Sequence, residues 1–66
     1  MFKTHASYKI GNKEVVAVSL DGVYSVCYYE NGGFVEAHDT DDELEAMNAY
    51  EWYCDKAFEI EYNKHH

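Results

Sequence analysis

Turn residues divide the first forty residues of the chain into four segments of similar length. Apolar and polar residues alternate within each segment, and this period of two is typical of β-strands. Asp21-Gly22 is a strong signal for a two-residue hairpin, because both central positions of a type I′ turn need positive φ. Gly11-Asn12 and Asn31-Gly32-Gly33 supply the other two turns. We therefore predict four antiparallel strands, over residues 2–10, 14–20, 23–29 and 34–38.

The hydrophobic period changes after these strands and predicts a helix. Thr40-Asp41-Asp42-Glu43 has the pattern of a capping box, in which the Thr40 hydroxyl and the Glu43 carboxylate accept hydrogen bonds from free amides at a helix start. Acidic residues in the first turn also complement the positive end of the helix dipole. We expect the helix to run from Asp41 to at least Lys56.

The end of this helix is open to two interpretations. Apolar and acidic residues alternate over residues 57–62, so this segment could form a short fifth strand. No Gly or Pro interrupts the run, and this favours continued helix. With either ending, the fold class is α+β: a single domain, residues 1–66, with a four-stranded antiparallel β-meander packed on one face by a C-terminal helix (ββββα).

Two-residue loops place odd-numbered residues of one strand on the same sheet face as even-numbered residues of the next strand. The face that we expect to form the core is almost wholly apolar and contains Phe2, Ala6, Tyr8, Ile10, Val15, Ala17, Tyr24, Val26, Tyr28, Val35 and Ala37. The opposite face combines polar residues with a second apolar set and contains Lys3, His5, Lys9, Val16, Val18, Leu20, Val23, Cys27, Tyr29, Phe34, Glu36 and His38. A loop register displaced by one residue would mix these two faces.

One stripe of the helix is apolar and is predicted to pack on the sheet. It contains Leu44, Met47, Tyr50, Cys54, Ala57 and Phe58, and a second group, Ala46, Ala49, Tyr53 and Ile60, widens the apolar arc. One helix cannot cover both faces of a sheet, so an apolar surface would remain in water unless a partner covers it. We therefore expect a homodimer or a second interface through the outer sheet face, at Val16, Val18, Leu20, Tyr29 and Phe34.

The charge balance restricts the partners. Thirteen acidic residues face five lysines, arginine is absent, and the formal net charge is -8. Such a chain repels nucleic acid and anionic membranes and attracts basic surfaces. The outward helix face carries carboxylates at intervals of roughly one turn, ~5.4 Å, beside a tryptophan, a residue type that often anchors interfaces. The predicted partner-binding residues are Asp41, Glu45, Glu51, Trp52, Asp55 and Glu59. The alternative interpretation is an ordinary solvated helix surface.

No pattern in the chain supports an enzyme, a metal site or a cofactor. Cys27 and His38 share a predicted sheet face, but a third ligand and an orienting residue are missing. The acidic run that begins at Asp39 lacks the spacing and the glycine of a calcium loop. A Cys27–Cys54 disulfide is less favoured than two thiols in a reducing compartment. The chain shows neither a signal core nor ~20 consecutive apolar residues, so we expect a cytoplasmic protein.

The small size, the charge of -8, the lack of arginine and the carboxylate-lined helix resemble a class of small acidic phage-encoded inhibitors, which includes anti-CRISPR proteins and other DNA mimics. The resemblance is one of class and involves no sequence motif. It implies a protein that acts in the host cytoplasm by occupying the basic site of a nucleic-acid-binding defence or nucleoid protein. His65-His66 resembles the remnant of a purification tag and is set aside.

Overall fold

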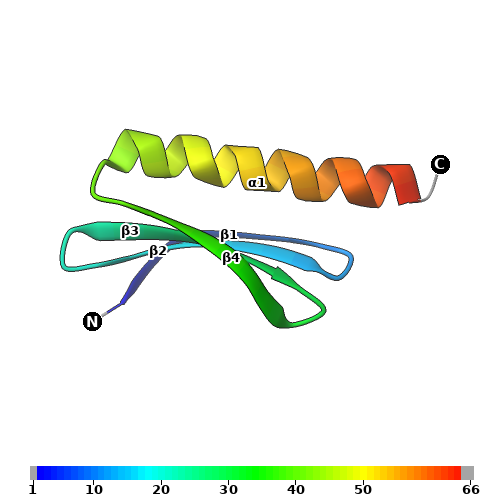
Figure 1. Cartoon of the computed structure of the whole chain (residues 1–66), viewed down its shortest axis with the longest axis horizontal. Helices are drawn as coiled ribbons and strands as arrows, with labels where there is room; N and C mark the ends of the chain where they lie inside the picture. Colours follow the sequence, from blue (N-terminus) through cyan, green and yellow to red (C-terminus); the bar gives the residue numbers. More distant parts are fainter. Residues whose placement is uncertain (1, 65–66) are drawn as a thin grey trace.

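A computed structural model of the chain describes residues 2–64 and confirms the predicted ββββα architecture (Figure 1). The strands β1 (Lys3–Ile10), β2 (Lys13–Leu20), β3 (Val23–Glu30) and β4 (Gly33–Thr40) form one antiparallel sheet in the order β1-β2-β3-β4. The helix α1 (Glu43–Lys64) follows and lies along one face of this sheet. His65 and His66, which we set aside as tag-like, lie outside the described residues.

The helix continues to Lys64, so residues 57–62 form no fifth strand. It begins at Glu43, two residues later than predicted, because Asp42 is the capping residue. The Asp42 Oδ1 atom accepts hydrogen bonds from the backbone amides of Leu44, at 2.9 Å, and Glu45, at 3.4 Å. The Thr40 hydroxyl instead accepts the Asp42 amide at 3.1 Å and shapes the connection before the helix.

The second turn has the backbone conformation that the sequence predicts, and the third turn shares it. Asp21 and Gly22 have φ values of 51° and 81°, the left-handed pair of a type I′ hairpin. Asn31 and Gly32 repeat this pattern with φ values of 55° and 77°. Gly33 is therefore the first residue of β4, and the third turn contains two residues rather than three.

A β-bulge in β4 reverses the predicted faces of the residues that follow Phe34 in that strand. Tyr29 pairs with Phe34, whereas Tyr28 pairs with Glu36, so Val35 is an extra residue without a partner. Beyond Val35 the side-chain alternation is shifted by one position. Glu36 and His38 consequently face the helix. Val35 and Ala37, which we predicted in the core, are exposed.

A second bulge, at His5 in β1, shifts the side-chain alternation of the residues that precede it. Thr4 pairs with Val18 and Ala6 with Ala17, and His5 lies between them without a partner. The predicted face of His5 is therefore wrong, because its Nε2 atom lies 2.7 Å from Ser19 Oγ on the helix-facing side. Phe2 is also outside the core that we predicted, and 71% of its surface is exposed.

The helix is rotated about its axis relative to the predicted orientation. Leu44, Met47 and Phe58, predicted to point inward, are 66%, 54% and 51% exposed. The buried core consists of Val15, Val26, Tyr28, Ala46, Tyr53 and Ala57, with Tyr8, Ile10, Ala17, Tyr24, Ala49, Tyr50 and Cys54 packed against it. The rings of Tyr28 and Tyr53 stack with their centroids 5.8 Å apart. Alanines on the inward stripe bring the helix close enough to the sheet for this contact.

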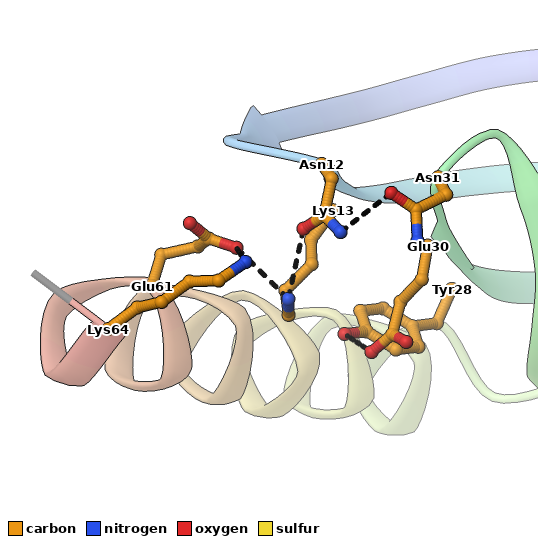
Figure 2. A network of polar contacts seen from close by, with 7 residues as sticks. All are labelled: Asn12, Lys13, Tyr28, Glu30, Asn31, Glu61 and Lys64. Carbon is orange, nitrogen blue, oxygen red and sulfur yellow. Dashed lines mark hydrogen bonds and ion pairs between the residues drawn. The ribbon is translucent and has the colours of Figure 1, made fainter.

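A buried ion pair joins the last turns of the helix to the sheet (Figure 2). The Lys13 Nζ atom lies 3.0 Å from Glu61 Oε1, and each residue is only 5% exposed. Lys13 also donates to Asn12 Oδ1 at 3.0 Å, and Asn12 Nδ2 donates to Asn31 Oδ1 at 2.8 Å. Gly11 has φ +58°, and a Cβ atom there would lie 2.6 Å from Glu61 Cδ, so both its conformation and its small size are needed. The pair thus connects the helix with two neighbouring turns.

Replacing one partner of this pair should destabilise the protein more than replacing both. Lys13→Met leaves the Glu61 carboxylate in a buried site without its nearest cation and is expected to lower the free energy of unfolding by about 3–5 kcal/mol. The double variant Lys13→Met/Glu61→Leu removes both charges and should recover most of that loss. Urea unfolding followed by far-ultraviolet circular dichroism measures the difference. Equal losses in the single and double variants would contradict an energetically coupled pair.

Tyrosine burial predicts a loss of stability in alkali. Burial, followed by a hydrogen bond with Cys54, raises the pKa of Tyr50 to about 12. Burial also raises the pKa of Tyr28 and of Tyr53. Because unfolded tyrosine has a pKa of about 10, this contribution to stability is intact below pH ~10 and is lost as the pH rises toward the folded values.

We expect the circular dichroism signal to fall together with the appearance of tyrosinate absorbance, between pH ~10 and ~12. Tyr50→Phe keeps the ring and removes the titrating hydroxyl, so its stability should depend less on pH over this interval. A wild-type chain whose tyrosines all ionise near pH 10 without unfolding would contradict the packing described here.

Candidate functional site

The predicted partner-binding side chains are all exposed, but they fall into two groups. Glu45, Glu51, Trp52, Asp55 and Glu59 project from α1. Asp41 lies in the connection before the helix and does not follow the helical repeat. The helix therefore presents fewer of the predicted carboxylates in one line than the sequence pattern implies.

Glu51, Asp55 and Glu59 form a carboxylate row along the outer surface of α1. They recur every fourth residue, so successive side chains are displaced by about 6 Å along the axis. Within residues 2–64, none of the three takes part in an ion pair or a hydrogen bond. Both lysines of the helix make contacts elsewhere: Lys64 lies at Glu61, and Lys56 lies over Trp52. Lys13, on β2, also pairs with Glu61. No cation among the described residues therefore pairs with the row.

Trp52 lies beside the carboxylate row in an ordered aromatic cluster. Its ring meets Tyr53 edge to face, with centroids 5.2 Å apart. The Lys56 ammonium lies over the Trp52 ring, 5.6 Å from its centroid, which is a cation–π contact. These two contacts orient an indole that is 54% exposed. The exposed position of Trp52 agrees with the prediction from the sequence. The contact with Lys56 was not predicted, although a spacing of four residues on a helix indicates that two side chains can meet.

Glu45 differs from the carboxylate row because residues of β4 hold it. Its Oε2 atom lies 3.1 Å from His38 Nε2. A hydrogen bond with Thr40, followed by the one with His38, holds the pKa of Glu45 below its usual value. The contact exists because the bulge in β4 turns His38 toward the helix. Glu45 therefore belongs structurally to the junction of β4 and α1.

That junction carries a second concentration of acidic residues, the acidic corner, formed by Asp39, Asp41, Asp42, Glu43 and Glu45. Most of its carboxylates accept hydrogen bonds within the protein. The Ser25 hydroxyl donates to Asp39 at 2.6 Å, and the Tyr24 hydroxyl donates to Glu43 at 3.0 Å. The latter bond raises the pKa of Tyr24. The acidic corner is therefore tied into the fold, whereas the side chains of the carboxylate row have no such contacts within residues 2–64.

The rotation of the helix leaves an apolar strip beside the carboxylate row, formed by Leu44, Met47, Phe58 and Tyr62, all exposed. The rings of Phe58 and Tyr62 stack with centroids 5.9 Å apart. Charged and apolar side chains thus occupy adjoining parts of one helix surface. Sequence analysis assigned three of these four residues to the core.

A pocket of about 470 Å³ lies between the first half of α1 and the strands β1, β2 and β3. Ala6, Ala17, Val26 and Ala46 supply apolar walls, and Tyr24 and Tyr50 supply aromatic ones. Glu43, Met47 and Glu51 also line it from the exposed side of the helix. The sequence does not predict this pocket, because no linear pattern reveals that three alanines on different elements face one another.

The outer face of the sheet is not covered by any element within residues 2–64. Phe34 is 63% exposed, and its ring meets that of Tyr29 with centroids 6.0 Å apart. Leu20 is exposed, and Val16, Val18 and Tyr29 are half-buried by their neighbours on the same face. These five residues therefore share one solvent-facing apolar surface.

The grouping of Cys27 with His38 on one sheet face is wrong. Cys27 pairs with Ala37 on the outer face, and the bulge places His38 on the helix side. Both cysteines are free; Cys54 lies on the helix, where burial raises the pKa of its thiol. No cluster of three or more metal-binding side chains occurs in the described part of the chain. No helix within residues 2–64 combines the length and the apolar character needed to cross a membrane.

Comparison with known proteins adds no relative from which a function could be transferred. No protein-family model matches the chain, and searches of curated proteins and of solved structures found no match. Functional inference for this fold therefore depends on the charges, contacts and surfaces described above.

Proposed function

We propose that this protein is a small acidic inhibitor that binds a basic, nucleic-acid-binding protein and occupies its nucleic-acid site. The observation that carries the proposal is the carboxylate row of Glu51, Asp55 and Glu59, which is exposed and unpaired within residues 2–64. Trp52, exposed beside the row, supplies an aromatic anchor.

The physical basis is a match of charge and spacing. Displacements of about 6 Å between carboxylates are comparable to the intervals between phosphates along a nucleic-acid strand. Lysine and arginine side chains that normally contact phosphates can therefore form charge-assisted hydrogen bonds with the row. The formal charge of -8 adds long-range attraction toward a cationic groove and repels competing nucleic acid.

This mode of action agrees with the resemblance to phage-encoded anti-CRISPR and DNA-mimic proteins. The protein would act stoichiometrically in the host cytoplasm, without catalysis, and the acidic corner would supply further contacts through Asp41. Apolar contacts by the strip beside the row would retain part of the affinity at high salt, where electrostatic attraction is screened.

Neutralising the carboxylate row should weaken partner binding. Glu51→Gln/Asp55→Asn/Glu59→Gln removes three charges without a change of shape, and at about 0.5–1 kcal/mol per contact it should lower affinity roughly tenfold to a hundredfold. Proteins captured from bacterial lysate by the wild-type chain at low salt are purified and bound to duplex DNA. The measurement is the concentration of wild-type or variant protein that displaces the DNA.

A control variant shows whether the position of the removed charges matters or only their number. Glu14→Gln/Asp21→Asn/Glu30→Gln also removes three charges, but from the sheet and its turns, and it should displace DNA almost as well as the wild-type protein. Equal effects of the two triple variants would contradict the carboxylate row as the contact surface. Capture of proteins that DNA does not compete for would contradict the mimicry itself.

The uncovered outer sheet face favours a second candidate function, a structural or regulatory homodimer that binds a protein partner through this face. Val16, Val18, Leu20, Tyr29 and Phe34 would form the interface. Burying exposed apolar area contributes about 25 cal/mol per Å², and the acidity of the chain would then serve solubility.

This second candidate predicts a dimer in solution at low micromolar concentration. Leu20→Ala/Phe34→Ala should convert it to a monomer, because both side chains lie on the outer face and neither belongs to the core. Phe58→Ala, which truncates an exposed side chain on the helix, should leave the dimer intact. Sedimentation velocity reports the mass, and a wild-type chain that is a strict monomer would exclude the homodimer.

A further inference from the structure

The pocket between α1 and the sheet is a consequence of residue choice. Ala6, Ala17 and Ala46 come from β1, β2 and α1 and lack the side-chain volume needed to fill the space between these elements. The resulting volume of about 470 Å³ falls within the ~300–1,000 Å³ typical of ligand sites. Exposed side chains of the helix line it, so it can be reached from solvent.

The chemistry of the pocket favours a cation with an apolar body. Tyr24 and Tyr50 contribute aromatic rings, whose faces attract cations. Glu43 and Glu51 also line the pocket, and they lie about 12 Å apart along the helix axis. Among the described residues no lysine lines it, and the imidazole of His5 is engaged with Ser19, whose Oγ lies 2.7 Å from Nε2.

The helix N-terminus opposes a bound cation, because its free amides carry partial positive charge. Two features reduce this opposition. The Asp42 carboxylate already accepts the amides of Leu44 and Glu45. The dipole effect falls off within the first turn, whereas Glu51 lies two turns into the helix. The Tyr24 hydroxyl also donates to Glu43 at 3.0 Å and holds that carboxylate at the pocket.

We propose that this pocket receives a lysine side chain of the basic partner, with its four-carbon stem against the alanines and its ammonium against the Glu43 carboxylate and the Tyr24 ring. The inference rests on the proposed function, because the occupant comes from the protein that the carboxylate row attracts. Glu51 belongs to both surfaces and makes them continuous. The carboxylate row then attracts the basic partner by its charge, and the pocket selects a long, slender basic side chain of that partner.

The test uses nuclear magnetic resonance of the intact chain, with the methyl groups of Ala17, Ala46 and Met47 as reporters. The probes are the capped tripeptide Gly-Lys-Gly, its Nε-acetyl-lysine form and n-butylammonium, each titrated to millimolar concentration. The lysine peptide should shift the three methyl signals. The acetylated peptide keeps the stem and loses the charge, and should bind about tenfold more weakly or not at all.

Two isosteric double variants locate the effect. Glu43→Gln/Glu51→Gln should reduce lysine-peptide affinity about tenfold, because glutamine still accepts the Tyr24 hydrogen bond while both charges are lost. Asp55→Asn/Glu59→Gln should leave binding of the lysine peptide to the pocket unchanged. It should weaken only the displacement of DNA from the captured protein, which depends on the carboxylate row. The two readouts therefore distinguish failure of the pocket from failure of the proposed function.

Several results would overturn the pocket assignment. These are equal binding of the acetylated peptide, shifts confined to residues of the carboxylate row, and no loss of affinity in Glu43→Gln/Glu51→Gln. Binding of n-butylammonium without binding of the tripeptide would identify a site for small free amines and overturn the assignment to a partner side chain.

Discussion

The buried ion pair between Lys13 and Glu61 determines how the helix lies on the sheet. A helix rotated to bury Leu44 and Met47 would gain about 1.5–3 kcal/mol for each side chain. The same rotation would separate the charges, now 3.0 Å apart, and leave Lys13 in a site that excludes water, at a cost of about 3–5 kcal/mol. It would also break the stacking of Tyr53 on Tyr28. The ion pair and the aromatic contact thus offset the burial that rotation would gain, and together with the small alanines at positions 46 and 57 they fix the observed orientation.

This orientation has a consequence for the surface. Because the inward stripe uses alanine at positions 46 and 57 and glutamate at position 61, larger apolar side chains face solvent. The helix consequently places an apolar strip, a carboxylate row and the mouth of a pocket next to one another. Each feature alone is common on small proteins. Their adjacency provides charge, apolar area and shape within one surface, which is the combination that interfaces with a few dominant contacts require.

Local sequence patterns were sufficient to predict the number of strands, their order and the existence of the helix, because period and turn chemistry act over a few residues. These patterns did not predict the correct sheet face where one extra residue shifts the register between two strands. Neither His5 nor Val35 carries a sequence signal for a bulge, yet each reverses every side chain beyond it. The carboxylate row was predictable, since an acidic helix face points outward in most orientations. The His38–Glu45 contact and the pocket were not, because both depend on how the helix meets the sheet.

The carboxylate row has a cost that a merely solvated helix surface would avoid. Like charges four residues apart on a helix destabilise it by about 0.2–0.5 kcal/mol per pair, and the row contains two such pairs, Glu51 with Asp55 and Asp55 with Glu59. Lys56, three residues before Glu59, could have relieved this repulsion, but its ammonium lies over Trp52. Local features that oppose stability without an evident structural gain are concentrated at functional sites. The unrelieved repulsion along α1 is therefore a physical argument in favour of the binding surface that we propose.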